Sequence, residues 1–166
     1  MYVETSGTSG LAGNLQSGIA VANTSSSPAA VTFDLTQLDG TAVPGITPVS
    51  IALTGFGQTT KFLADIFPTL PNPFTGVLRV TTSSSGISVV GLRTRYNERN
   101  DFLITTTSPT VESSPSTTAQ IVFPHVADGG GYTTQFILFS SGVGQSSSGT
   151  LRFFDTAGQP LSLSPQ

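Results

Sequence analysis

Five charged residues gather in one short stretch of a chain that otherwise carries little charge. Six basic and nine acidic residues are spread over 166 positions, yet five fall within nine positions, at Arg93, Arg95, Glu98, Arg99 and Asp101. Arg93 and Arg95 alternate, so in a strand their side chains share one face. Paired guanidinium groups could bind a carboxylate or a sugar acid, with Tyr96 as a neighbouring aromatic surface. The alternative is a structural network in which Glu98 and Asp101 pair with the arginines, and the pattern favours it.

The single histidine, His125, is the other candidate for chemistry. With Asp128 and one of many serines it could form a hydrolytic triad, but the sequence has neither a G-x-S-x-G nor an S-x-x-K motif. We expect the His125 side chain to form a hydrogen bond with the backbone beside the glycines at 129–131. Asp128 lacks the neighbouring carboxylates that Ca²⁺ requires, so a tight turn with positive φ is favoured there. We therefore predict no catalytic residue, no metal site and no cofactor.

The composition of the chain excludes some classes of binding partner. The net charge is −3 and the six cations are scattered, so the chain has no basic face of the kind that binds nucleic acid. No run approaches the roughly 18 apolar residues of a membrane span, so we expect no membrane insertion. Charged residues make up 9% and hydrophobic residues 37% of the sequence. A folded domain with an uncharged surface rich in hydroxyl groups fits this balance. Cysteine is absent, which excludes disulfides and thiolate metal sites.

The elements that must position these residues are strands. Residues 30–37 alternate between apolar and polar side chains, which predicts a half-buried strand followed by a turn at Asp39-Gly40. Residues 61–67 form the one helix-like piece, which ends before Pro68. The pattern predicts an all-β, immunoglobulin-like antiparallel β-sandwich with one short connector helix at about 61–67. Further strands are expected at 18–23, 49–53, 76–82, 87–96, 102–106, 120–123, 132–140, 150–154 and 161–163.

Two local details are expected around residues 76–96. The strands at 76–82 and 87–96 are separated by only four turn-forming residues, so we expect them to pair as a hairpin. In the second strand the apolar parity changes between Val89 and Val90. Gly91 lies at this change and is a candidate β-bulge.

The later strands repeat the order of the earlier ones. GIAVAN at 18–23 corresponds to QFILFS at 135–140, and VTFDLTQLDG at 31–40 to GTLRFFDTAG at 149–158, at offsets of 117 and 118. This repeat predicts a β-sandwich unit at 1–110 and a partial second β unit at 118–166. Residues 107–118, with two prolines among Ser and Thr, are expected to form the connection. The partial unit needs the first unit or another chain to cover it.

Four consecutive apolar residues mark the candidate assembly surface. Phe136, Ile137, Leu138 and Phe139 would place bulk on both faces of one strand. A strand with water on one face would alternate instead. We therefore expect these residues to be covered on both sides, by the rest of the chain or by a partner.

Two stretches carry a resemblance to known modules. GLRTRYNERNDFLITTT (91–107) and FPHVADGGGYTTQ (123–135) resemble uncharacterised β-sandwich modules repeated in large secreted or surface proteins of environmental bacteria. The resemblance covers most of the chain and implies an extracellular location and a tandem arrangement. It carries over no enzymatic activity and no binding residue.

The sequence therefore predicts a non-catalytic structural or adhesive module of a secreted or cell-surface bacterial protein, and not an enzyme. We expect it to assemble head-to-tail, or by strand exchange, with neighbouring modules or identical subunits. The alternative is a carbohydrate- or other ligand-binding module, in which Arg93, Arg95 and Tyr96 contact an acidic glycan.

Overall fold

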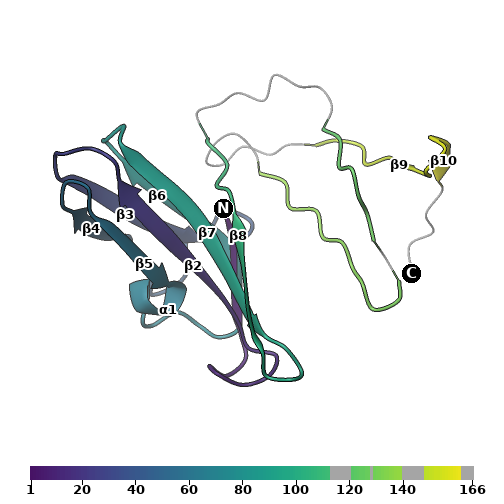
Figure 1. Cartoon of the computed structure of the whole chain (residues 1–166), viewed down its shortest axis with the longest axis horizontal. Helices are drawn as coiled ribbons and strands as arrows, with labels where there is room; N and C mark the ends of the chain where they lie inside the picture. Colours follow the sequence, from purple (N-terminus) through teal and green to yellow (C-terminus); the bar gives the residue numbers. More distant parts are fainter. Residues whose placement is uncertain (113–120, 128, 140–147, 162–166) are drawn as a thin grey trace. The chain divides into compact units, whose positions relative to one another are not determined.

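The computed structural model describes residues 1–112, 121–127, 129–139 and 148–161. The chain divides into two compact units, Met1–Val111 and Glu112–Gln166. The first unit contains all the strands of the large sheet and the one helix of the described residues (Figure 1).

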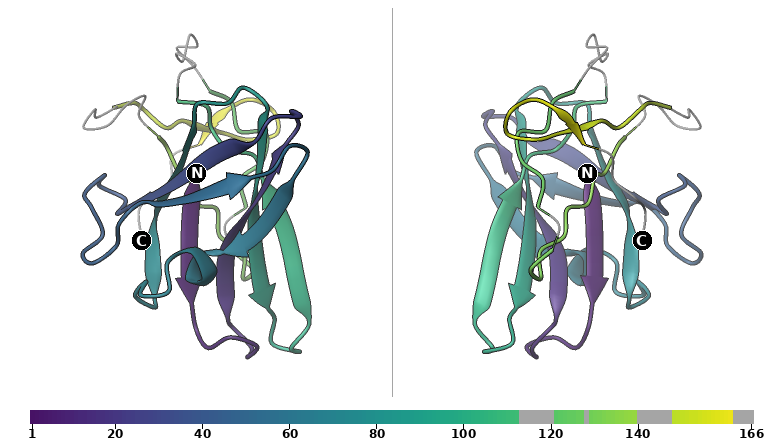
Figure 2. Two further views of the ribbon diagram at one scale, coloured as in Figure 1. Left: turned by 90° about the vertical axis from the view of Figure 1, so that its left-hand side faces the viewer. Right: turned by 90° about the vertical axis from the view of Figure 1, so that its right-hand side faces the viewer.

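The first unit is an antiparallel sheet that curls strongly into a half-barrel around one short helix (Figures 1 and 2). Its strands run in the order β4-β3-β6-β1-β2-β7-β8, and β5 also pairs with β2. The elements of this unit are β1 (Tyr2–Ser6), β2 (Leu15–Asn23), β3 (Ala29–Thr36), β4 (Val49–Leu53), β5 (Gln58–Phe62), α1 (Leu63–Ile66), β6 (Phe74–Thr82), β7 (Ile87–Tyr96) and β8 (Phe102–Thr107). The prediction of an all-β antiparallel fold with one short helix is confirmed.

Strand β1 joins the two halves of the sheet, β4-β3-β6 and β2-β7-β8. It pairs with β6 over Tyr2–Thr5, and then with the start of β2 through Thr5 and Ser6. Farther along β2, the same edge pairs with β5 from Gly18 to Ala22. Two strands therefore share one edge of β2, while β7 occupies its other edge along the full length.

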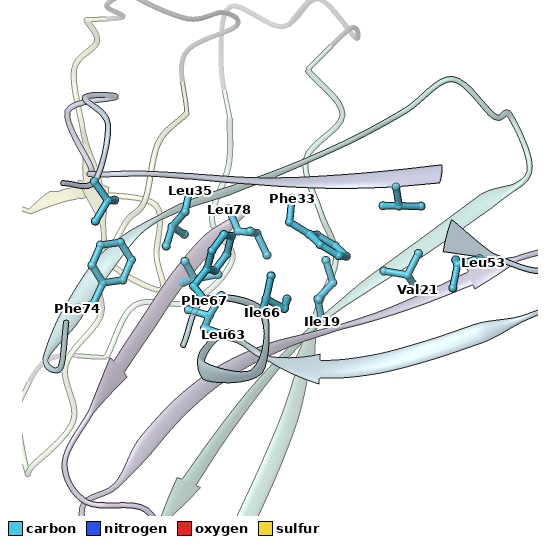
Figure 3. Packing of buried hydrophobic residues seen from close by; sticks show 13 residues of the cluster. Ile19, Val21, Phe33, Leu35, Leu53, Leu63, Ile66, Phe67, Phe74 and Leu78 are labelled. Carbon is cyan, nitrogen blue, oxygen red and sulfur yellow. The ribbon is translucent and has the colours of Figure 1, made fainter. Parts of the chain in front are cut away.

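The core lies inside the curl because β2 and β3 each direct alternate side chains toward it. In β3, Val31, Phe33 and Leu35 are buried, while the residues between them are more exposed. Strand β2 contributes Ile19 and Val21 (Figure 3). The later elements supply the opposing side chains Leu53, Leu63, Ile66, Phe67, Phe74 and Leu78. The alternation predicted for residues 30–37 is confirmed.

Helix α1 begins at Leu63, later than the predicted start, because Lys61 and Phe62 belong to β5 and pair with β2. The Phe62 amide donates a 3.0 Å hydrogen bond to the Asp65 carboxylate, which satisfies an amide at the entry to the helix. Leu63 and Ile66 are buried, so the helix fills the core beneath β2 and β5.

Two local predictions about strand pairing are wrong. Strands β6 and β7 do not form a hairpin: β6 pairs with β1 and β3, and β7 with β2 and β8. Gly91 is not a bulge, because the register of β7 with β2 runs through it without interruption, and in the register with β8 it is the last paired residue, opposite Thr107. A Cβ at Gly91 would collide with the Met1 side chain and the Thr107 hydroxyl. The glycine permits this close approach.

The second unit contains little regular structure within its described residues. A two-stranded ladder joins β9 (Phe153–Phe154) to β10 (Pro160–Leu161). Residues 121–123 and 133–139 form no strand, so the predictions at 120–123 and 132–140 are wrong for those residues. Gln120, Ser140 and residues 162–163 lie outside the described residues. A strand requires a hydrogen-bonded neighbour, and apolar sequence alone does not supply one.

Candidate functional site

Arg93 lies on β7 and pairs with a residue that the sequence did not suggest. Its Nε atom donates a 2.6 Å hydrogen bond to Oε1 of Glu4 on β1, and Nη2 lies 2.5 Å from the same oxygen. The Glu4 amide donates to the Ser17 hydroxyl of β2 at 2.9 Å. Ser17 lies directly opposite Arg93 in the ladder. The Arg93–Glu4 pair therefore ties β1 to β7 across β2.

Tyr2 completes this polar group. Its hydroxyl donates to Oε2 of Glu4 at 3.2 Å. Burial raises the pKa of Tyr2, and the negative charge of Glu4 and this hydrogen bond raise it further. Arg93 opposes the shift but does not cancel it. Glu4 thus accepts from a guanidinium and a phenol, which leaves less of its carboxylate available to a ligand.

The other two arginines of the cluster, Arg95 and Arg99, pair with acidic residues of the loop that connects β7 to β8. Arg95 pairs with Glu98, and Arg99 Nε lies 3.2 Å from Oδ2 of Asp101. Both pairs agree with the structural interpretation of the cluster. Asn97, which the sequence analysis did not single out, organises the loop: its Oδ1 accepts from the amides of Arg99 and Asp101 at 3.0 and 2.8 Å. An Asn that follows a strand and precedes a short charged loop was the available signal.

Tyr96 packs against Phe102 across the ladder. The ring centroids are 5.2 Å apart and the planes are tilted by 55°. The two residues are paired at the start of the β7–β8 hairpin. Arg93, Arg95 and Tyr96 therefore lie near one another on β7, but each has an intramolecular partner. Their role in binding an acidic glycan stays a prediction.

Strand β8 is the most exposed apolar element of the first unit. It forms one end of the sheet and pairs only with β7. All six of its residues are exposed, including Phe102 (50%), Leu103 (50%) and Ile104 (58%). Because successive side chains alternate, these three residues place apolar surface on both faces of the strand. We call this strand the β8 edge.

Residues 102–106 were predicted to form a strand, but their apolar exposure at the β8 edge was not expected from the sequence. The signal was present in the sequence. Three consecutive large apolar residues, Phe102 to Ile104, are followed by three threonines with no charge among them. Like Phe136–Phe139, this run places large apolar side chains on both faces of a strand.

The predicted assembly residues of the second unit are only partly covered. Phe136 and Ile137 are half-buried, whereas Leu138 (71%) and Phe139 (39%) are exposed. Phe136 contacts Phe123 with a centroid distance of 4.8 Å, and Phe153 with one of 6.3 Å. These aromatic contacts gather three separate stretches of the second unit without burying them fully.

The residues considered for catalysis and metal binding, His125 and Asp128, precede the run of three glycines at 129–131. His125 is exposed, and Asp128 lies outside the described residues. The Gly129 and Tyr132 backbones exchange two 3.0 Å hydrogen bonds, and Gly130 and Gly131 have positive φ. The expected tight turn is therefore present. Within residues 1–112, 121–127, 129–139 and 148–161, no three His, Asp or Glu side chains are grouped to hold a metal ion.

The chain matches no family model, no curated protein and no solved structure at a significant level. No helix in the part of the chain that the structure describes is long and apolar enough to cross a membrane.

Proposed function

We propose that this chain is a non-catalytic structural or adhesive module of a secreted or cell-surface bacterial protein. It joins neighbouring modules or further copies of itself, head-to-tail or by strand exchange. The β8 edge is the observation that carries this proposal. The low charge and the surface rich in hydroxyl groups support the extracellular location, as does the resemblance to repeated modules of bacterial surface proteins.

Strands at the edge of a sheet are prone to pair with further strands. An edge strand has one row of unpaired backbone donors and acceptors, and monomeric proteins usually protect such edges with charges, prolines or bulges. The β8 edge carries none of these, and it exposes apolar side chains on both faces. Strand β4, at the other end of the sheet order, buries Leu53 and half-buries Val49 and Ile51. Of the two end strands of the large sheet, β8 is therefore the one that combines open hydrogen-bonding groups with uncovered apolar surface, which favours addition of a strand.

We also propose that the half-barrel is an immunoglobulin-like sandwich in its layout. Strands β4, β3 and β6 would form one layer, and strands β5, β2, β7 and β8 the other. The pairing of β1 with both β6 and β2 supports this layout, since one strand then bridges two layers. The core residues drawn in Figure 3 come from elements assigned to both layers.

Size-exclusion chromatography with light scattering tests the assembly. We expect the mass of the unmodified chain to rise with concentration. Ile104→Lys should keep it monomeric, because a charge on the β8 edge opposes pairing. Leu103→Glu changes the other face of the strand, opposite Arg95, and should act similarly.

Ala52→Lys is the matched control, since it places the same charge on an exposed position of β4. Circular dichroism confirms that each variant is folded. The proposal fails if the unmodified chain is monomeric at every concentration. It also fails if Ala52→Lys disrupts association as strongly as Ile104→Lys does.

A further inference from the structure

The turn that follows β3 occurs again in the second unit, 118 residues later. In the first unit, the Gln37 amide donates to the Thr41 carbonyl at 2.8 Å, and the Gly40 amide to the Gln37 carbonyl at 3.0 Å. In the second unit, the amides of Asp155 and Gly158 make the same two bonds, to Gln159 and Asp155, at 2.9 and 3.0 Å. Gly40 and Gly158 have φ values of 83° and 77°.

The pairing that flanks each turn also corresponds. Thr36 pairs with Ala42 in the first unit, and Phe154 pairs with Pro160 in the second. Phe154 lies 118 positions after Thr36, and Pro160 lies 118 positions after Ala42. Such a turn is common as a local motif, but its agreement with the offset of the sequence repeat is an independent observation. The two units therefore share the backbone arrangement of this turn as well as a sequence pattern.

The side chains that form the core in the first unit remain large and apolar in the second. At offsets of 117 and 118, the corresponding pairs are Ile19 and Phe136, Val21 and Leu138, Phe33 and Leu151, Leu35 and Phe153, and Val43 and Leu161. All five members in the first unit are at most 4% exposed. In the second unit, Leu138, Leu151 and Leu161 are 71%, 50% and 48% exposed. One core position differs, since Gly149 stands where the first unit has Val31.

Contacts within the second unit join counterparts of the core residues of the first unit. The rings of Phe136 and Phe153, the counterparts of Ile19 and Leu35, have centroids 6.3 Å apart. An open depression is lined by Leu151, Phe153 and Leu161 among its six residues. The counterparts of these residues, Phe33, Leu35 and Val43, belong to the core of the first unit. The second unit thus gathers four of these five core positions, but leaves Leu151 and Leu161 about half exposed.

The first unit shows what covers such a face. Apart from Val3 of β1 and Val43, the buried side chains packed over β2 and β3 there come from β4, α1, β6 and the residue after α1, which lie within residues 44–107. We propose that the apolar face formed by residues 135–139 and 148–161 is a docking surface for one polypeptide segment with the residue pattern of 44–107. That segment completes a second half-barrel, in which Leu138, Leu151 and Leu161 are buried. This inference is independent of association through the β8 edge.

The test is a fusion. A copy of residues 44–107 is joined directly after Leu161, the counterpart of Val43, in an otherwise full chain. The Ile104→Lys change in both copies removes association through the β8 edge. Amide hydrogen exchange at residues 136–138 is the readout. We expect exchange to slow on the order of 100-fold relative to the chain without the fused segment, because local protection follows the stability of the unit that contains the amide. A second cooperative unfolding transition should accompany it.

Two matched controls make the result specific. In one, the fused residues have the same composition in scrambled order. In the other, only the fused counterparts of Phe74 and Leu78 are replaced by Ser. Neither should slow the exchange. Equal exchange in the fusion and the scrambled control overturns the proposal. So does strong protection in the unfused chain, whether constant or rising with concentration, because the chain or a second copy would then already cover the face.

Discussion

At the scale of single residues, the Arg93–Glu4 pair shows how a predicted binding residue acquires a structural role. Arg93 was singled out with Arg95 because alternating arginines share a strand face. The sequence gives no hint that the partner is Glu4, 89 residues away, because that contact depends on β1 lying beside β2. Arg95–Glu98 is a local pair, and the sequence analysis expected Glu98 and Asp101 to pair with the arginines without saying which pairs form.

The two kinds of ion pair should differ in their effect on stability. The Glu4 side chain is 20% exposed, whereas Arg99 and Asp101 are 83% and 54% exposed. Arg93→Gln should lower the free energy of unfolding by roughly 0.5–1 kcal/mol, the upper part of the range for partly exposed pairs. Arg99→Gln should change it by less than about 0.3 kcal/mol. Urea unfolding measures both, and equal losses would contradict the assigned roles.

The Tyr2–Glu4 contact predicts a dependence on alkaline pH. The pKa of Tyr2 is raised in the folded state, chiefly by burial and then by Glu4. The neutral phenol is therefore favoured by folding, and its contribution is complete below the pKa of the unfolded chain. That contribution is lost as pH rises through the higher folded-state pKa. Thermal unfolding followed across this alkaline range should show the loss.

Glu4→Gln isolates the cause of the Tyr2 shift. Removing the negative charge should lower the pKa of Tyr2 toward its ordinary value, although burial keeps part of the shift. An NMR titration of the ring resonances follows Tyr2 separately from Tyr96 and Tyr132. A Tyr2 pKa that stays unchanged in Glu4→Gln would show that Glu4 does not act on the phenol.

At the scale of elements, the sequence predicts what depends on neighbouring residues and misses what depends on distant ones. The alternation of Val31, Phe33 and Leu35 is local, and β3 matches it. The choice of partner for β6 is not local: β6 lies between β3 and β1, and this placement prevents the expected hairpin with β7. Strand β5 was missed because Gln58-Thr59-Thr60 has no apolar alternation to signal it.

Gly76 on β6 should tolerate no side chain. A Cβ there would collide with the backbone carbonyl oxygen of Thr36 and with the Phe74 ring. Because backbone cannot move aside as a flexible side chain does, Gly76→Ala should cost on the order of 1–3 kcal/mol of unfolding free energy. Thr75→Ala, at an exposed position on the same strand, should cost little. Chemical denaturation of both variants tests this, and a neutral Gly76→Ala would contradict the packing described for β6.

At the scale of the whole molecule, the two units differ in how they satisfy their apolar residues. The first unit buries thirteen of them in one cluster inside the curled sheet. The described part of the second unit exposes most of its large apolar side chains, among them Ile121, Val122, Leu138 and Leu151. The sequence could predict that Phe136–Phe139 need cover, but not what provides it. Strands form only with a partner, and the identity of that partner is not encoded locally.

The central claim, that the β8 edge joins one module to another, is tested most directly by amide exchange at residues 102–107 measured at several protein concentrations. Addition of a strand gives the outward-facing amides of β8 new acceptors, which protects them from exchange. We predict that their exchange slows as concentration rises in the unmodified chain and in Ala52→Lys, but not in Ile104→Lys. If the exchange of these amides does not depend on concentration in any of the three proteins, the β8 edge does not join modules.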